Sequence, residues 1–414
     1  MKTPPGFDNL ALAFGNPDYR LYALASFPSL IGTWIQRVAV GWLAWELTES
    51  GTWLGLIAFA DMLPVMVLTP ISGAFADRLD RLAASRLLQY ALSLQALVLA
   101  GLVLAGLITI ELLVMLTFVQ GILHAIFHPF RQALIANMVK PRELVGAIAV
   151  NSMMWHSARF IGPAFAGLAI VAFGAGVAIA INVATYVPFL IALHLISVQR
   201  HGTGAGRSLA AIPREIADGV SLAVSHPAIG PMFVLLFAIS VAGRAAAELL
   251  PGFAGAVFDR DAMGLAWLTS AAGFGAMLGS LFAAHRSSPD RLPGRVIGSS
   301  VLLVAALSGF VATDIFAVAL PCLALSAFAL AIGGVGTQTV VQYAVPEAFR
   351  GRVLGLYGLL WLGCPAIGTL AVGALSDLWG LQAALAVAVV LPAAAWLWTA
   401  GRRRTIEAGL APPP

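Results

Sequence analysis

The sequence predicts an all-α membrane protein whose chain crosses the bilayer twelve times. Hydrophobic residues make up 60% of its 414 residues and charged residues only 10%, whereas soluble domains carry about 25% charged residues. The apolar runs reach the roughly 20 residues that one membrane-spanning helix needs. They are rich in Leu, Ala and Val, and they lack the alternation seen in the roughly ten-residue strands of membrane barrels.

Charged or turn residues divide the apolar runs into twelve expected helices. In chain order these cover residues 21–46, 53–75, 84–107, 112–138, 144–172, 176–198, 228–250, 263–284, 295–312, 315–343, 352–375 and 380–400. Cys322 and Cys364 both fall inside such runs, so neither a disulfide framework nor a metal cluster is expected. No phosphate-binding loop, His-Glu-x-x-His motif or Cys-rich motif occurs, which argues against an enzyme.

The basic residues indicate which ends of the helices face the cytoplasm. With the N-terminus placed in the cytoplasm, 18 of the 23 Lys and Arg residues fall in cytoplasmic segments, and the outer loops hold only Arg260. The positive-inside rule predicts this asymmetry, so the net charge of +4 reports topology and not nucleic-acid binding. We expect a multi-pass protein of a bacterial-type inner membrane with both termini in the cytoplasm.

Two diverged halves are expected, each a bundle of six helices. Pro141-Arg-Glu-Leu-Val-Gly146 is echoed by Pro346-Glu-Ala-Phe-Arg-Gly351 in the second half. Between the halves, apolar residues near helical spacing after Ser208 predict an amphipathic helix on the cytoplasmic membrane surface. The expected domains are therefore 1–199, a cytoplasmic linker at 200–227, and 228–414. Parallel six-helix repeats are common in secondary transporters, which place the substrate site between the repeats.

A charged turn joins the second and third expected helices. Five charged residues fall within ten positions, and such a density must lie in water: Asp77, Arg78, Asp80, Arg81 and Arg86. We interpret the turn as a gate and not as a plain connection. The corresponding stretch of the second half keeps a glycine at Gly279 but has Ala283 in place of the acid. Any role of Asp77 is therefore asymmetric.

Several short motifs recur in order along the chain. The charged turn matches the pattern Gly-x-Leu-Ala-Asp-Arg-x-Gly-Arg at Gly73, Ala76, Asp77, Arg78 and Arg81. The other motifs are Trp34-Ile-Gln36, Glu46-Leu-Thr48, Pro129-Phe-Arg131, Asn151-Ser152, Arg159-Phe-Ile-Gly-Pro-Ala164 and Val345-Pro-Glu-Ala-Phe-Arg-Gly-Arg352. With this ordered set the chain resembles the major facilitator superfamily. Within it, the chain is most similar to the branch of bacterial exporters that includes the enterobactin exporter.

The resemblance implies roles for two groups of residues. A cytoplasmic gate would be formed by Gly73, Asp77, Arg78 and Arg81, with Gly351 and Arg352 at the start of the eleventh helix. The fifth-helix motif associated with export would be formed by Gly162, Pro163 and Gly167. Gly162-Pro163 also removes one helix hydrogen bond and permits close helix contact. Many family members carry Arg three residues before a Gln-Gly pair, whereas this chain has Thr117 there.

Ionisable residues inside the bilayer are candidates for the transport chemistry, because each costs roughly 2.5–3.5 kcal/mol to insert. The principal candidates are Arg37, Asp61, His124, Arg159, Arg244 and Glu248, with His128, Arg131 and His156 beside them. Arg37 and Asp61 lie at similar expected depths on consecutive helices, and Glu248 follows Arg244 by one turn, so either pair can form an ion pair. Such pairs either hold helices in register or couple substrate binding to proton release.

Coupling would follow from competition for an Arg. Burial favours the neutral carboxyl group, whereas a nearby Arg favours the carboxylate. The histidines are interpreted as hydrogen-bonded structural residues, with proton relay as the alternative. Four tryptophans are interpreted as packing or interface residues, with cavity lining by some of them as the alternative: Trp34, Trp42, Trp45 and Trp155. The excess of Arg over acids at mid-membrane favours an anionic or polar acidic substrate.

These features predict a secondary active exporter of amphipathic small molecules, either siderophore-like metabolites or drugs, driven by proton antiport. One alternative is a lipid or lysolipid flippase with the same fold. Another is a membrane substrate sensor, although no soluble signalling domain is evident. We expect a monomer in the lipid bilayer that uses the proton gradient, with no cofactor, no metal site and no nucleic-acid partner.

Overall fold

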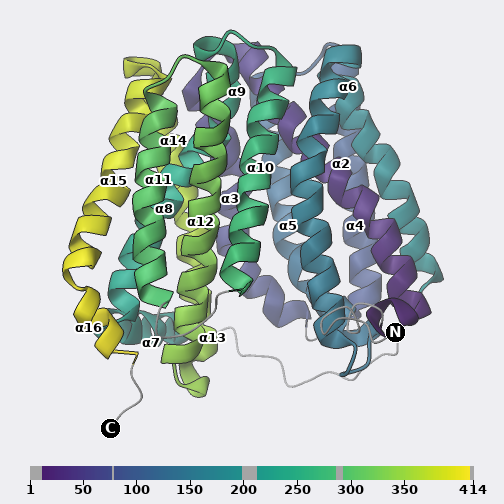
Figure 1. The fold of residues 1–414 in the computed structure, drawn as a ribbon. Helices are drawn as coiled ribbons and strands as arrows, with labels where there is room; N and C mark the ends of the chain where they lie inside the picture. Colours follow the sequence, from purple (N-terminus) through teal and green to yellow (C-terminus); the bar gives the residue numbers. More distant parts are fainter. Residues whose placement is uncertain (1–11, 77–78, 198–211, 286–291, 411–414) are drawn as a thin grey trace, which may run out of the picture. The chain divides into compact units, whose positions relative to one another are not determined.

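The computed structural model describes residues 12–76, 79–197, 212–285 and 292–410, and all regular elements in these ranges are helical. The first half contains α2 (Pro17–Thr48), α3 (Gly51–Ala76), α4 (Arg81–Leu104), α5 (Ile110–Met138) and α6 (Leu144–Leu195) (Figure 1). The rest contains α7 (Ile212–Ser225), α8 (Ile229–Glu248), α9 (Leu250–Gly252), η2 (Phe253–Val257), α10 (Ala262–His285), α11 (Leu292–Val311), α12 (Phe316–Ala344), α13 (Glu347–Gly358), η4 (Leu359–Gly363), α14 (Cys364–Trp379), α15 (Leu381–Gly401) and α16 (Arg403–Ala408).

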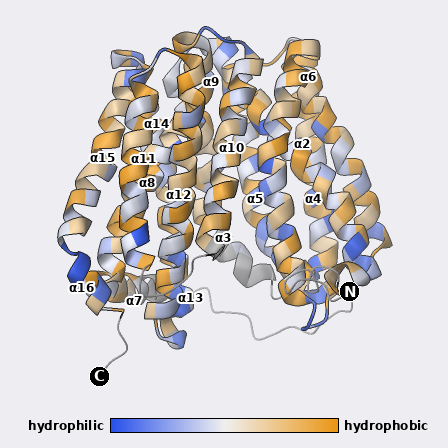
Figure 2. Cartoon of the chain, viewed as in Figure 1, coloured by the Kyte–Doolittle hydropathy of each residue, from blue (hydrophilic) through white to orange (hydrophobic). Residues whose placement is uncertain are grey.

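The described helices account for the predicted membrane crossings. Ten of them are long and apolar enough to cross a membrane. With 52 residues α6 is long enough for two crossings, and α2 is a 32-residue helix interrupted by charges such as Arg37. Counting α6 twice and adding α2, the described part of the chain has twelve spans. Figure 2 shows hydrophobic colours along most of α11, α12 and α15, and hydrophilic colour at α16.

A single glycine separates the two spans within α6. Gly174 has φ 82° and ψ 166°, in the middle of otherwise helical backbone. This backbone region is populated almost only by glycine, because a Cβ atom would clash there. The break falls between the predicted helices 144–172 and 176–198, so the sequence prediction placed both spans correctly.

Contacts between Cα atoms divide the chain into two compact units. Unit 1 comprises Met1–Leu43 and Pro64–Leu209, and unit 2 comprises Ala44–Leu63 and Ala210–Pro414. The ends of α2 and α3 that meet at their connecting turn therefore belong to unit 2, while the remainder of both helices belongs to unit 1. Each unit contains its own candidate residues.

Unit 1 has a core of aromatic and aliphatic side chains from α2, α4, α5 and α6. Tyr22 and Phe189 are fully buried within it, with ring centroids 5.4 Å apart in an edge-on arrangement. The Tyr19 hydroxyl donates to the Ala147 carbonyl at 2.8 Å, and Asn16 Nδ2 donates to the Met138 carbonyl at 2.8 Å. These bonds fix the start of α2 against α5 and α6.

Unit 2 is built around α8, which contacts α12, α14 and α15. The amphipathic helix predicted between the halves is α7, although Ser208 lies outside the described residues. Its buried residues Gly219 and Ala223 face α13 and a core cluster that includes Phe233. In this structure the buried side of α7 therefore packs against α13 and this core cluster of unit 2.

Candidate functional site

In unit 1 the clearest candidate site is the Trp34 cluster, formed by Trp34 and Arg37 of α2 with Trp155 and Arg159 of α6. The guanidinium carbons of Arg37 and Arg159 lie 5.7 Å and 5.6 Å from the centroid of the Trp34 ring. Trp155 meets the same ring edge-on, with centroids 5.9 Å apart. The structure thus brings the predicted candidates Arg37 and Arg159 together around Trp34. The sequence alone did not decide whether Trp34 is a packing residue or lines a cavity.

Close packing of two helices positions the Trp34 cluster. A Cβ atom on Gly162 would lie only 2.5 Å from Trp34 Cβ, so α2 and α6 approach here at a distance that no larger residue allows. The neighbouring Pro163 and Gly167 are also buried. The predicted close contact at the Gly-Pro motif is therefore confirmed, and its partner is Trp34.

The Trp34 cluster combines two cationic groups with two aromatic rings. A guanidinium group within about 6 Å of an indole is attracted to the face of the ring. Arg can also bind a carboxylate or phenolate through two parallel hydrogen bonds. Trp34 Nε1 is buried and has no hydrogen-bond partner among the described residues. All four side chains retain partial exposure.

A second polar group in unit 1 is organised by Arg131 of α5. Its Nε atom donates to the Tyr22 hydroxyl at 2.9 Å, and its Nη2 atom donates to Asn151 Oδ1 at 3.3 Å. His124 and His128 lie on the same helix, seven and three residues earlier. The contacts join α2, α5 and α6, and they give Asn151 of the predicted Asn-Ser motif a definite partner.

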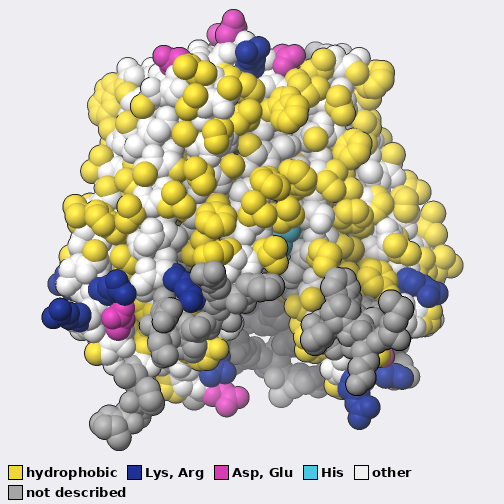
Figure 3. All heavy atoms as spheres, viewed as in Figure 1, with side chains coloured by type: hydrophobic (Ala, Val, Ile, Leu, Met, Phe, Trp, Pro, Cys, Tyr) yellow, Lys and Arg dark blue, Asp and Glu magenta, His cyan; other side chains and the backbone are white. Residues whose placement is uncertain are grey.

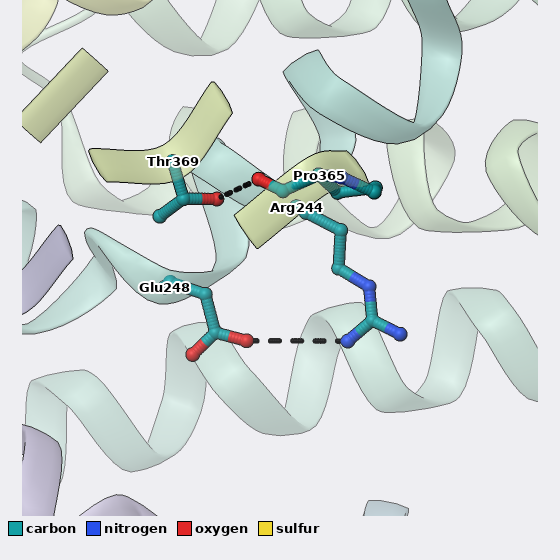
Figure 4. Close-up of polar contacts among 4 residues, drawn as sticks. All are labelled: Arg244, Glu248, Pro365 and Thr369. Atoms are coloured by element: carbon teal, nitrogen blue, oxygen red, sulfur yellow. Dashed lines mark hydrogen bonds and ion pairs between the residues drawn. The ribbon is translucent and has the colours of Figure 1, made fainter. Parts of the chain in front are cut away.

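In unit 2 the candidate site is the Arg244–Glu248 pair of α8. Arg244 Nη1 and Glu248 Oε1 are 4.0 Å apart, and the two side chains are 24% and 20% exposed. The predicted one-turn spacing therefore does bring the pair to ion-pair distance. Figure 4 shows both side chains extending beside Thr369 and Pro365. Arg244 and Glu248 line a small pocket. The other residues that line it come from α3, η4 and α14: Ala58, Met62, Leu362, Pro365, Ala366 and Thr369.

Irregular helix geometry surrounds the Arg244–Glu248 pair. α8 ends at Glu248, and Pro251 and the π-helix η2 follow directly. On the facing segment the π-helix η4 precedes Pro365. Proline removes a backbone donor, and a π-helical turn widens the helix, a feature frequent at functional sites. A proline and a π-helical turn therefore lie on both segments beside the pair.

A separate polar contact in unit 2 closes the turn between α2 and α3. The Asp377 carboxylate of α14 accepts from Ser50 Oγ at 2.6 Å, from the Gly51 amide at 2.7 Å and from the Thr52 amide at 3.3 Å. Asp377 thereby caps the start of α3 from another helix, where the helix dipole favours a negative charge. No local sequence pattern indicates this contact.

For several predicted residues, the structure describes only some of the contacts that the sequence predicts. Asp77 and Arg78 lie outside the described residues, so the gate remains a prediction. Gly73 lies in α3, Arg81 Nη1 donates to Asn137 Oδ1 at 2.8 Å, and α13 contains Gly351 and Arg352. Arg37 and Asp61 belong to different units, so their pairing also remains a prediction. Among the described residues, no group of three His, Cys, Asp or Glu side chains could hold a metal ion.

One polar network in unit 1 was missed entirely by sequence reasoning. Gln36 Nε2 donates to Gln120 Oε1 at 3.0 Å, and Asn182 Nδ2 donates to Gln36 Oε1 at 2.6 Å. Gln95 completes the group: its Oε1 accepts from Gln36 Nε2 at 3.5 Å, and its Nε2 donates to the Leu116 carbonyl at 3.1 Å. All four amides are buried. The available signal was the placement of an amide side chain in each of four apolar runs, because buried polar groups need partners.

The helical spans define a polytopic α-helical membrane protein with charged groups inside its spans. A family model described as transmembrane secretion effector matches residues 12–411, and the chain belongs to this family of the major facilitator superfamily. The predicted fold and the predicted resemblance to bacterial exporters are both confirmed. Because the family and the relatives are transporters, the protein is a transporter and not an enzyme.

Several relatives carry functional names. The multidrug efflux pump Tap of Mycolicibacterium fortuitum is 25% identical over 390 residues, covering 90% of this chain and 92% of Tap. The enterobactin exporter EntS of Shigella flexneri is 24% identical over 380 residues, covering 89% of this chain and 87% of EntS. The staphyloferrin A transporter of Staphylococcus aureus is 26% identical over 148 residues, and this match spans 35% of the chain and 36% of that transporter.

A solved structure shows the same fold. The crystal structure of a bacterial homologue of the human lysosomal transporter Spinster matches with a TM-score of 0.76 and 16% identity. The match covers 96% of this chain and 99% of that protein. The similarity establishes the arrangement of helices as the major facilitator fold.

Proposed function

We propose that the protein is a secondary active exporter that moves an anionic, amphipathic small molecule out of the cytoplasm. The observation that carries this proposal is the Trp34 cluster, where two guanidinium groups lie over one indole ring. A siderophore-like metabolite or an acidic drug that contains a ring would satisfy both the charges and the aromatic face. Relatives named as an exporter and as an efflux pump support the outward direction.

The energy source in this proposal is a proton gradient, with Glu248 as the coupling group. Its carboxylate lies beside Arg244 at 4.0 Å and lines a pocket. A proton on Glu248 would release Arg244 to an anionic substrate, and loss of that proton would return Arg244 to the carboxylate. The proposed location is the inner membrane of a bacterial cell, with both termini in the cytoplasm and the protein active as a monomer.

Transport into inverted membrane vesicles tests the function. We would compare a radiolabelled catecholate siderophore with a lipophilic cationic dye, each with and without a protonophore. The proposal expects siderophore uptake that collapses when the proton gradient is removed. Siderophore uptake that persists without a gradient would contradict antiport. Preference for the cationic dye would contradict the substrate class.

Two substitutions separate binding from coupling. Arg159→Gln removes a charge-assisted hydrogen bond worth about 1.5–3 kcal/mol, so siderophore affinity should fall roughly 10- to 100-fold. Glu248→Gln should abolish most gradient-driven uptake while substrate exchange without a gradient continues. Arg142→Gln, an exposed residue outside the helices, serves as the control and should leave both activities near wild type. Normal gradient-driven uptake by Glu248→Gln would rule out this coupling residue.

A further inference from the structure

A second pocket lies in unit 2, away from the Arg244–Glu248 pair, where α10 ends and α11 begins beside α12. Its lining includes Phe282, Leu292, Arg295, Val296, Ile332 and Thr339. All but two of these six side chains are apolar. The pocket is therefore a hydrophobic recess at the end of three membrane-spanning helices, with one cationic side chain in its wall.

The guanidinium group of Arg295 is only partly satisfied in this recess. Its Nη1 atom is buried and has no hydrogen-bond partner among the described residues. A buried charged donor without a partner is costly, so it favours a ligand that brings negative charge. Thr339 contributes no free donor, because its hydroxyl donates to the Val335 carbonyl at 2.8 Å. Anion binding in the recess thus depends on Arg295.

The surroundings of the recess are basic and mark a membrane interface. Arg403 of α16 packs on Gly294, the residue before Arg295, because a Cβ atom there would lie 3.0 Å from its Nη2. Arg402 stacks on Trp398 at 4.2 Å, and Glu407 pairs with Arg403 at 2.7 Å. Tryptophan and basic residues at a helix end are typical of the headgroup region. Figure 3 shows Lys and Arg side chains gathered near this end of unit 2.

We propose that this recess, the Arg295 pocket, binds an anionic phospholipid of the surrounding bilayer. The phosphodiester would accept from the guanidinium group of Arg295, and an acyl chain would lie along the exposed Phe282 and the partly exposed Val335. Basic pockets between membrane helices bind anionic headgroups by this combination of charge and apolar wall. A free anion gains nothing from the apolar wall, whereas a phospholipid satisfies both parts. The inference concerns a bound lipid and is independent of the transported substrate.

Lipid retention by the purified full-length protein tests this proposal. After delipidation in detergent, phosphatidylglycerol or phosphatidylcholine is added in equal amounts, and bound lipid is measured by native mass spectrometry. The wild type should retain phosphatidylglycerol preferentially. Arg295→Gln should weaken that retention about fivefold, the effect of about one basic contact near a membrane surface. Arg142→Gln, an exposed charge in unit 1, should retain it normally.

Three results would overturn the proposal. These are equal retention of the two lipids, unchanged phosphatidylglycerol retention in Arg295→Gln, and displacement of the lipid by inorganic phosphate at millimolar concentration. Ala283→Leu provides a second variant, because Ala283 lines the pocket while the arginine remains. The larger side chain should reduce retention by filling the recess. This variant answers the question if Arg295→Gln does not fold.

Discussion

At the scale of single residues, Gly162 determines whether the Trp34 cluster can form. A Cβ atom at this position would lie 2.5 Å from Trp34 Cβ, so Gly162→Ala must push α2 and α6 apart. Overpacking of this kind costs about 1–3 kcal/mol. We expect a lower thermal unfolding temperature and weaker binding of an anionic substrate, measured by differential scanning fluorimetry and by ligand titration.

Gly101→Ala provides the matched control for that substitution. Gly101 also lies in a helix of unit 1, but a Cβ atom there would meet nothing within 4 Å. Alanine favours helix over glycine by about 1 kcal/mol, so this variant should be as stable as the wild type or slightly more stable. Equal behaviour of Gly162→Ala and Gly101→Ala would show that the close approach of α2 and α6 is not needed.

At the scale of secondary-structure elements, Asp377 joins α14 to the start of α3. Asp377→Asn removes the negative charge and keeps the side chain nearly the same size. Capping and helix-dipole interactions of this type contribute about 0.5–2 kcal/mol. We expect the stability of purified protein to fall by that amount, with a larger loss at low ionic strength because salt screens the charge.

Asp314→Asn is the control for the Asp377 substitution. Asp314 is an exposed acid of unit 2 whose Oδ1 accepts from Gln382 Nε2 at 2.9 Å. This contact is with a side chain and not with the backbone amides at a helix start, so the replacement should change stability by no more than a few tenths of a kcal/mol. Similar losses in both variants would mean that the Asp377 contacts with α3 are energetically ordinary surface contacts.

The elements and the contacts between them differ in how well the sequence predicts them. The spans follow from apolar run length, and Arg244 meets Glu248 because helical spacing alone brings them together. Gln36 and Asn182 are 146 positions apart, and nothing in either local pattern indicates the other. Trp34 meets Arg159 only through the packing of α2 on α6. Contacts that depend on how helices pack can therefore be identified only from the structure. Contacts that follow from the helical period can be predicted from the sequence.

At the scale of the whole molecule, the charged turn before α4 is predicted to control exchange between conformations. Asp77 would interact with the N-terminus of a facing helix by about 0.3–2 kcal/mol. Asp77→Asn should therefore shift the balance between conformations by about 2- to 30-fold, with substrate affinity nearly unchanged. Spin labels at Arg142→Cys in unit 1 and Glu347→Cys in unit 2, with Cys322 and Cys364 replaced by Ala, would report the distance distribution by pulsed electron paramagnetic resonance.

Asp80→Asn is the control three residues away, because Asp80 caps α4 within unit 1. Its carboxylate accepts from the Leu82 and Ala83 amides at 3.0 and 3.1 Å. It should lower stability without changing the distance distribution. Loss of substrate binding in Asp77→Asn with an unchanged distribution would show that this turn is not a gate.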